Sequence, residues 1–326
     1  MPRLRWGLLS TARINRALIP AIRGAARSEL TAVASRTLDR AREYALEWQI
    51  PRSIGAYEAL LADPGIDVVY ISLPNHLHVE WTVRALEAGK HVLCEKPLAL
   101  SVGDVDRVAD AARRAGRVAA EAFMYRHHPL TDAVQAFAAG GRLGRITTYR
   151  GAFTFLLTRE HDVRLDPSMG GGSLWDVGCY PLSYANLIAG AAPTEVFGWE
   201  RRLDRDVDME FFAMLRYADG SVAQFDCGFA GPFRAEMEIV GTAGRLCIRR
   251  PFKTDERSAL EFSGGDDRTE GVLFDPAAAY AGEVADIEAA ALDGTAPRVP
   301  LTESRRTVQT IVALYESARL GRPVGL

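Results

Sequence analysis

The chain has 326 residues, 48% of them hydrophobic and 25% charged, with a formal net charge of −3 at pH 7. The length allows two domains, and the slightly acidic balance argues against nucleic acid as a main partner. No apolar run is as long as a membrane span, residues 1–10 lack the apolar core of a signal peptide, and the four cysteines form no C-x-x-C pair. We therefore expect a reduced, cytoplasmic protein with no membrane partner and no disulfide or zinc scaffold.

Short apolar strands alternate with helical patterns up to about residue 120. The strand patterns are 4–9, 30–34, 67–72, 91–94 and 118–121, and the helical patterns are 14–22, 38–48, 78–87 and 102–115. The run 67–72 is rich in β-branched residues and unbroken, as is typical of parallel strands buried on both faces. Strands separated by helices of this length predict βαβ units and a doubly wound parallel sheet of the Rossmann type.

After about residue 125 the strands follow one another without intervening helices, which predicts an antiparallel sheet. The strand patterns are 146–157, 195–202, 209–217, 221–229, 236–240 and 245–248, with flanking helices at 130–137, 180–188, 279–292 and 307–318. We expect an α/β protein with a dinucleotide-binding Rossmann domain over 1–122. An α+β domain for substrate binding and oligomerisation would follow over 123–326, with a largely antiparallel open sheet and C-terminal helices that can pack back on the first domain.

The apolar run 91–94 ends in the tripeptide Glu95-Lys96-Pro97. Pro97 has no N–H and keeps Lys96 extended, so the strand ends there. Lys96 is therefore delivered to the carboxyl edge of the predicted sheet, where open α/β sheets bind ligands. At that edge its ammonium can reach a substrate oxygen. The alternative is a solvated lysine at a strand end.

The first strand-to-helix turn lacks the G-x-G-x-x-G pattern of a dinucleotide fold, whose glycines let backbone N–H groups approach a pyrophosphate. Ser10 and Ala12 stand where the first two glycines would be, and Asn15 stands at the third. Both small side chains still permit close approach, and the Ser10 hydroxyl could reach a phosphate. The alternative is a strand–turn–helix without a ligand. The residues assigned to this cofactor turn are Gly7, Ser10, Thr11, Ala12, Arg13 and Ile14.

The second strand ends in Ser35-Arg36, whereas an NAD site places a carboxylate there for the ribose 2′-hydroxyl. Asp39 comes three residues later and falls on the predicted helix. An arginine in this place accommodates a 2′-phosphate, so Ser35 and Arg36, with Arg40, favour NADP over NAD. The alternative is an exposed arginine at a helix start.

The segment 170–181, GGGSLWDVGCYP, has the richest chemistry of the second half. Its glycines allow a sharp turn with positive φ. Asp176 and Tyr180 are spaced i, i+4 and would share a helix face, where a carboxylate can hold substrate hydroxyls while a phenol handles a proton. Pro181 either kinks this helix or marks where the regular helix begins. The structural alternative is a glycine turn and a tyrosine that packs by its ring.

In combination these motifs resemble the Gfo/Idh/MocA oxidoreductases over nearly the whole chain. The resemblance rests on Glu95-Lys96-Pro97, the turn 74–78 (PNHLH), the segment 170–181 and the C-terminal helices. Tyr180 stands where many members have histidine, and with the segment 121–126 it is similar to dimeric dihydrodiol dehydrogenases, glucose–fructose oxidoreductase and NADP-dependent D-xylose 1-dehydrogenases. Ser10 and Ala12 depart from the family's usual glycines.

This resemblance implies hydride transfer between C4 of a nicotinamide and a carbinol or carbonyl carbon of a sugar, polyol or trans-dihydrodiol. Tyr180 would be the general acid/base, and the charge of Lys96 would lower the pKa of its phenol from the free value of about 10. Asp176 would hold a neighbouring hydroxyl. No metal is needed, and the adjacent His127 and His128 are not expected to form a metal site. The other cofactor residues that the resemblance implies are Leu73, Pro74, Asn75, Glu95, Lys96, Arg126 and His78, although His78 could instead only cap or pack.

Two other functions stay open at this point. One is a redox-neutral, NAD-dependent glycoside-cleaving enzyme, which would hold its cofactor tightly and show no net NADPH change. The other is a non-catalytic NADP-binding protein, against which the joint presence of Lys96, Asp176 and Tyr180 speaks.

We also expect self-association. A sheet covered by helices on one face leaves the other face open. Family resemblance implies a homodimer or higher homo-oligomer through this sheet. We place Phe211, Ala213, Leu215, Val222, Gln224 and Asp226 on the mixed face that meets the partner copy.

Overall fold

The computed structural model describes residues 3–253, 256–265, 269–275 and 279–326. The chain forms two compact units. Met1–His127 and Ala278–Arg305 make up the first, and His128–Ala277 with Arg306–Leu326 make up the second. The first unit is therefore formed by the N-terminal part of the chain together with a later segment that contains the helix 279–293. The second unit is formed by the residues between these two parts and by the C-terminal residues.

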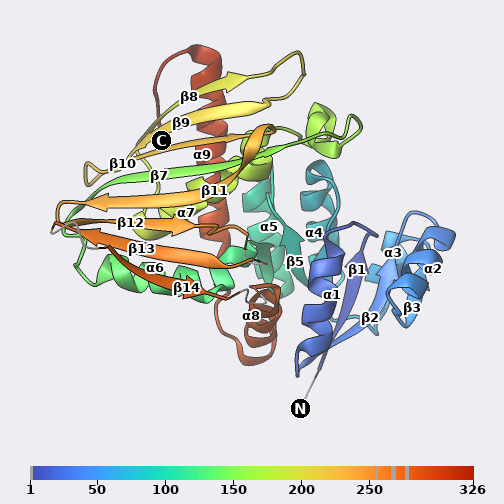
Figure 1. The fold of residues 1–326 in the computed structure, drawn as a ribbon. Coiled ribbons are helices and arrows are strands. Elements are labelled where there is room, and N and C mark those ends of the chain that lie inside the picture. The colour runs from blue at the N-terminus through green and yellow to red at the C-terminus, as the bar shows by residue number, and fades with distance from the viewer. Residues whose placement is uncertain (1–2, 254–255, 266–268, 276–278) are drawn as a thin grey trace. The chain divides into compact units, whose positions relative to one another are not determined.

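The first unit contains the predicted Rossmann sheet, in which described strands run in the order β3-β2-β1-β4-β5-β6, every neighbouring pair parallel. Figure 1 labels β1, β2, β3 and β5 of this sheet. The strands are β1 Leu4–Leu9, β2 Ser28–Ala34, β3 Arg52–Ile54, β4 Val68–Ile71, β5 His91–Glu95 and β6 Ala119–Ala122. The helices are α1 Asn15–Gly24, α2 Leu38–Glu47, α3 Tyr57–Leu61, α4 His78–Glu87, α5 Val102–Ala115 and α8 Ala279–Asp293, with short 3₁₀ turns at Asn75–Leu77 and Met124–His127.

Burial on both faces explains the uninterrupted apolar character of β4, whose four residues are all fully buried. On one face α8 packs beside α1, so that Val284 and Ile287 join Leu18 and Ile22 in the core of this unit. The late helix α8 therefore completes the burial of a sheet formed by the first part of the chain.

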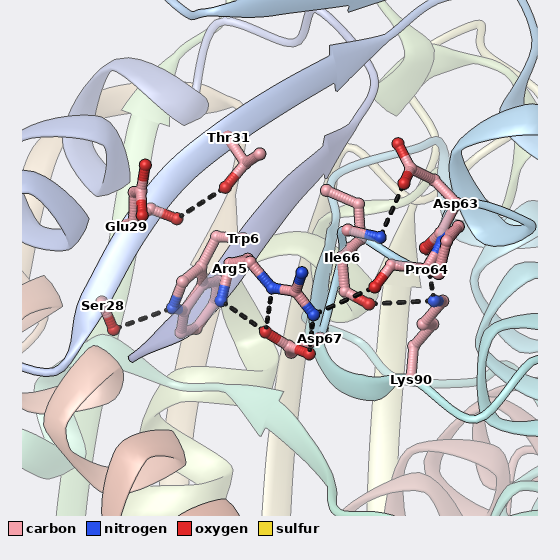
Figure 2. A network of polar contacts seen from close by, with 11 residues as sticks. Arg5, Trp6, Ser28, Glu29, Thr31, Asp63, Pro64, Ile66, Asp67 and Lys90 are labelled. Atoms are coloured by element: carbon pink, nitrogen blue, oxygen red, sulfur yellow. Dashed lines mark hydrogen bonds and ion pairs between the residues drawn. The ribbon is translucent and has the colours of Figure 1, made fainter. Parts of the chain in front are cut away.

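A polar network fixes the amino edge of this sheet (Figure 2). Arg5 pairs bidentately with Asp67, its Nε lying 2.8 Å from Oδ2 and its Nη2 2.8 Å from Oδ1. Lys90 donates from Nζ to the carbonyls of Asp63 and Ile66 at 2.7 and 2.9 Å. These contacts tie together the segments that enter β1, β4 and β5. They lie at the edge opposite to the one where such sheets bind ligands, so their role is structural.

The second unit contains a mixed, largely antiparallel sheet, whose described strands run in the order β14-β13-β12-β11-β7-β10-β9-β8-β15, with β7 and β10 parallel. The strands are β7 Ile146–Leu156, β8 Glu195–Arg201, β9 Glu210–Arg216, β10 Val222–Gly228, β11 Ala230–Gly241, β12 Gly244–Arg249, β13 Ser258–Gly264, β14 Thr269–Phe274 and β15 Val324–Gly325. The helices are α6 Pro129–Ala139, α7 Cys179–Ala189 and α9 Leu301–Leu320, which belongs to this unit from Arg306 onward. There are also 3₁₀ turns at Val163–Leu165 and Pro167–Met169 and a π-helical turn at Leu174–Gly178. In the described part of the chain, no helix is both long enough and apolar enough to cross a membrane.

The two faces of this sheet correct one prediction. The strand register places Phe211, Ala213 and Leu215 opposite Cys227, Phe225 and Ala223. All six side chains are buried on the face where Phe211 meets Tyr315 of α9. Gln224 and Asp226 instead share the outer face with Phe212 and Met214. Phe211, Ala213 and Leu215 therefore do not belong to an exposed mixed face, because neighbouring strands pair in a register that turns them toward the helices.

Candidate active site

Most of the cofactor residues expected from the sequence follow strands β2, β1, β4 and β5, which are consecutive neighbours in the sheet. Because these strands are parallel, the turns after them lie along one carboxyl edge. The turns carry Ser35 and Arg36, residues 10–14, residues 73–75, and Glu95 with Lys96. Gly7 lies inside β1, where an added Cβ would meet Leu60 Cδ2 at 3.0 Å, so its small size serves the packing of α3.

Ser10 has a φ of 145°, in the region that favours glycine, so it occupies the first glycine position with a backbone typical of glycine. Its hydroxyl lies 2.7 Å from Ser72 Oγ and accepts a hydrogen bond from the Ala12 N–H at 3.1 Å. Asn15 closes the network, because its Nδ2 donates to Ser10 O at 2.9 Å and its Oδ1 accepts from Ser72 Oγ at 2.6 Å. The hydroxyl that we expected to reach a phosphate is thus used inside the protein, where it stabilises the turn.

The N-terminus of α1 suits an anionic ligand. Ile14 at the N-cap has no side-chain acceptor, and the first turn contains no acidic residue. N–H groups at such a helix end carry partial positive charge and bind phosphate groups well. Arg13, exposed in the preceding turn, adds a full positive charge.

Two arginines beside the end of β2 lie close enough to Tyr57 for their charges to act on its phenol. Arg40 of α2 donates from Nε to Thr11 Oγ1 at 3.0 Å, which ties the helix to the cofactor turn. Burial raises the pKa of Tyr57, and the charges of Arg36 and Arg40 oppose that rise. The guanidinium groups of both arginines therefore act on the same phenol, and Ser35 beside them is buried.

His78 does not present a free ring to a ligand. It is 1% exposed, with Nδ1 2.8 Å from Pro97 O and Nε2 2.7 Å from Leu73 O. Burial lowers its pKa, so the ring stays neutral. Of the alternatives open from the sequence, the structure favours packing: His78 links the turn after β4 to the one after β5. A hydrogen bond from this ring to a cofactor would need one of those two contacts to break.

Glu95 and Lys96 lie at the end of β5, as predicted, and the Lys96–Pro97 peptide is cis. The hydroxyl of Tyr70 donates to Glu95 Oε1. Glu283 of α8 lies close enough to Glu95 for the two carboxylate charges to repel each other. Both carboxyl oxygens of Glu283 are buried without a hydrogen-bond partner among the described residues. Burial and then the charge of Glu95 raise the pKa of Glu283 well above the ordinary value. Sequence reasoning missed this carboxyl group, because a lone glutamate in a helical pattern gives no signal.

Arg126 is 5% exposed and donates from Nη1 to Glu303 Oε2 at 2.5 Å. Its Nη2 also lies 3.3 Å from the carbonyl of Arg298. These contacts occupy a side chain that the sequence suggested for the cofactor. Burial lowers the pKa of the neighbouring His127 to about 3. Among the described residues, no three His, Cys, Asp or Glu side chains gather as a metal site would require.

Asp176 and Tyr180 do not share one regular α-helix, which corrects the i, i+4 expectation. Asp176 lies in the π-helical turn Leu174–Gly178, and Tyr180 lies in the first turn of α7, which begins at Cys179. Pro181 follows in that first turn, where a missing N–H costs nothing, so the regular helix does begin near the proline. Single π turns occur often at functional sites.

Arg164 is the principal residue that sequence reasoning missed. Its Nε lies 2.6 Å from Asp176 Oδ2, and its Nη1 lies 3.2 Å from Asp162 Oδ1. Asp176 and then Asp162 raise the pKa of Arg164, so the guanidinium stays charged. The arginine comes from the 3₁₀ turn Val163–Leu165, in a loop whose path no periodicity predicts. It converts the isolated carboxylate of Asp176 into an ion pair.

Tyr180 is 6% exposed and packs in an aromatic cluster. Its ring centroid lies 5.3 Å from that of Phe153 and 5.4 Å from that of Phe252. This packing fixes the ring. It is consistent with a tyrosine that only packs by its ring, and equally with a phenol held in place for a reaction.

Comparisons with known proteins identify the relatives of this chain. A family model described as an oxidoreductase family with an NAD-binding Rossmann fold matches residues 4–123, and the Gfo/Idh/MocA C-terminal domain model matches residues 131–247. The chain is 39% identical to a D-xylose 1-dehydrogenase (NADP⁺) of Haloferax volcanii, over 99% of this chain and 100% of that protein. It is 33% identical to a trans-1,2-dihydrobenzene-1,2-diol dehydrogenase of Bos taurus, over 76% of this chain and 75% of that one.

A solved structure gives the same result. The crystal structure of a 3-ketoreductase from Actinomadura kijaniata, in complex with NADP and TDP-benzene, has a TM-score of 0.91 and 32% sequence identity. The match covers 97% of this chain and 98% of that one. With both family domains matched and relatives aligned over nearly its whole length, this chain belongs to the Gfo/Idh/MocA family of oxidoreductases.

Proposed function

We propose that this protein is an NADP-dependent oxidoreductase that transfers hydride between the nicotinamide and a carbinol or carbonyl carbon of a sugar, polyol or trans-diol. The observation that carries the proposal is the full-length similarity to the Haloferax D-xylose 1-dehydrogenase. The carboxyl edge of the Rossmann sheet supports it, because Lys96 and the turns suited to a dinucleotide lie along that edge.

The residues present fit NADP. The N-terminus of α1, which no side chain caps, and the glycine-like backbone of Ser10 suit the pyrophosphate. Arg36 and Arg40 would hold the 2′-phosphate, because a guanidinium binds a phosphate through charge-assisted, often bidentate hydrogen bonds. Ser35, Leu73, Pro74, Asn75 and Glu95 would line the rest of the nucleotide site.

The protein's own groups would act as follows. NADP supplies the hydride acceptor in the oxidation direction. Lys96 donates a hydrogen bond to the reacting substrate oxygen and stabilises negative charge there. Tyr180 takes the hydroxyl proton, and we assign to the positive charge of Lys96 the role of favouring its phenolate form. Asp176, oriented by Arg164, accepts a hydrogen bond from a neighbouring substrate hydroxyl.

A screen of aldoses, inositols and trans-diols with NADP, followed at the NADPH absorbance band, tests this function. Lys96→Met should lower kcat by about 10²–10⁴, the scale of a positioned proton-transfer group. Lys253→Met, which changes an exposed lysine, is the matched control. Substrate turnover with no net NADPH would favour the redox-neutral glycoside-cleaving function. Cofactor binding without turnover of any substrate would favour a binding protein.

We further propose that the outer face of the second unit's sheet forms a homodimer interface. Trp199 and Met214 expose 53% and 45% of their surface on this face, beside charged pairs such as Arg150–Glu238 at 2.9 Å. A second copy would bury these apolar side chains and meet charges of both signs. Met214→Glu should convert a dimer to monomer in light scattering at micromolar concentration, whereas Leu46→Glu, at an 82% exposed site of the first unit, should not. A wild-type monomer under these conditions would contradict the interface.

A further inference from the structure

The start of the π-helical turn is held by a carboxylate from elsewhere in the chain. Ser173 at the N-cap makes no side-chain cap of its own. Asp208, just before β9, takes its place: Oδ2 accepts from Ser173 Oγ at 2.7 Å and from the Leu174 N–H at 2.8 Å. The Ser173 N–H also donates to the Asp208 carbonyl at 2.9 Å. A negative charge and an acceptor at this end are what a helix N-terminus favours.

The other oxygen of Asp208 is held from α9. Tyr315 donates its hydroxyl to Asp208 Oδ1 at 2.7 Å, and its ring lies 5.9 Å from that of Trp175 inside the π turn. Asp208 is 3% exposed. Both carboxyl oxygens are thus occupied by protein donors, so the group is committed to one geometry and is not available to a substrate.

Gly172 shows how closely this contact determines the turn. Its φ is +120°, and an added Cβ would come within 2.3 Å of Asp208 Oδ1 and 2.9 Å of the Tyr315 hydroxyl. The Gly172 carbonyl accepts from the Asp176 N–H at 3.1 Å, and the Gly172 N–H donates to the Arg164 carbonyl at 2.9 Å. One residue therefore connects the Asp208 contact to both members of the Arg164–Asp176 ion pair.

We propose that Asp208, with Tyr315, is a positioning residue: it fixes the glycine turn and the π turn, and so sets where Asp176 and Tyr180 stand for the reaction. The inference rests on the proposed function for its catalytic consequence. A π turn is an uncommon conformation that needs tertiary support, and a small misplacement of a catalytic group can cost a large factor in rate.

The test compares variants that keep or remove the acceptor. Asp208→Asn retains a carbonyl that can accept from Ser173 and Leu174, with its amide turned toward Tyr315, so kcat should stay within a few-fold of wild type. Asp208→Ala should lower kcat by about 10²-fold and leave the KM for NADP unchanged. Tyr315→Phe removes only one hydroxyl and should give a smaller loss of kcat. Ser317→Ala, which removes buried hydrogen bonds to Gly198 and Arg322 from the same helix, is the control and should leave kcat unchanged.

A double-mutant cycle separates positioning from general damage. If Asp208 acts in part through Asp176, the loss caused by Asp208→Ala should be smaller when Asp176→Asn is already present, because coupled residues are not additive. Full additivity, or wild-type kcat in folded Asp208→Ala and Tyr315→Phe, would overturn the inference. If Asp208→Ala does not fold, Tyr315→Phe carries the same comparison.

Amide hydrogen exchange gives a readout that does not depend on activity. The Leu174 and Asp176 amides should exchange faster in Tyr315→Phe than in wild type, while the amides of β10 stay protected. Unchanged exchange at these two amides would overturn the positioning role of Asp208 and Tyr315, even if the protein proved to have another function. If the wild-type protein shows no NADP-linked turnover, but the Leu174 and Asp176 amides exchange faster in Tyr315→Phe as expected, only the proposed function is contradicted.

Discussion

Arg164 Nε lies 2.6 Å from Asp176 Oδ2 and forms an ion pair with the carboxylate that we assign to the substrate. The Asp176 side chain is only 14% exposed, so its charge depends on this neighbour more than a surface charge would. The pair also links the loop after β7 to the π turn, and both elements belong to the second unit.

Arg164→Met should therefore weaken the handling of substrate and spare the cofactor. The methionine keeps the apolar bulk but leaves Asp176 without its cation, and we expect kcat/KM for the substrate to fall by about 10- to 100-fold. The dissociation constant of NADP, measured by fluorescence titration, should not change. Arg159→Met, at a 61% exposed arginine 3.8 Å from Asp162, is the matched control. Equal effects of the two substitutions would remove Arg164 from the site.

Tyr180→Phe tests whether the phenol does chemistry or only packs. The phenylalanine keeps the contacts with Phe153 and Phe252, so the melting temperature should stay near that of wild type. Loss of the hydroxyl should lower kcat by about 10²–10⁴ at saturating substrate, the range for general acid–base groups. Undiminished turnover would make Tyr180 a packing residue.

Cofactor choice should depend on Arg36. Arg36→Ala removes a charge-assisted hydrogen-bond donor for the 2′-phosphate, and a bond of this kind contributes about 1.5–3 kcal/mol. We expect the ratio of kcat/KM for NADP to that for NAD to fall by about 10- to 100-fold. Arg42→Ala removes the same charge from an exposed site on α2, the helix that follows Arg36, and should leave the ratio unchanged. A constant ratio in both variants would refute the assignment.

Glu283 should make the protein less stable as the pH rises. Because burial raises its pKa above the unfolded value of about 4.3, the folded state binds this proton more tightly than the unfolded chain. Its stabilising contribution is complete below the unfolded pKa and is lost as the pH rises toward the folded value.

Glu283→Gln removes that titration. Relative to wild type, the variant should gain stability between about pH 5 and pH 8, reaching about 1–3 kcal/mol. Denaturant unfolding at the two pH values measures the difference. Glu288→Gln on the same helix is the contrast: Glu288 Oε1 accepts from Ser28 Oγ at 2.7 Å, so this change should give no such gain. A Glu283→Gln effect independent of pH would contradict the assignment.

Local signals in the sequence predicted much of the first unit. Helix α5 begins after Ser101, which caps it at 3.2 Å from the Asp104 N–H, and ends at Gly116 with φ of +59°. Strands β13 and β14 were missed: β13 alternates buried and partly buried residues only over a short stretch, and the edge strand β14 is exposed over most of its length, so burial imposes no pattern on it.

The site was less predictable, for a physical reason. Lys96 could be placed because a proline ends its strand at a known edge. The π turn depends on Asp208 and Tyr315, which are distant in sequence, and Arg164 reaches Asp176 from an irregular loop. Contacts between residues distant in sequence form only when the chain has folded, so no local sequence pattern predicts them.

In the proposed reaction the hydride passes directly from the substrate to NADP. The most direct test supplies a sugar deuterated at the carbon to be oxidised, D-xylose labelled at C1 being the first choice, and determines the mass of the NADPH formed. The NADPH formed should be heavier by one deuterium, with label at C4 of the nicotinamide, and Lys96→Met should form it about 10²–10⁴ times more slowly. Unlabelled NADPH, or sugar conversion without any NADPH, would contradict it.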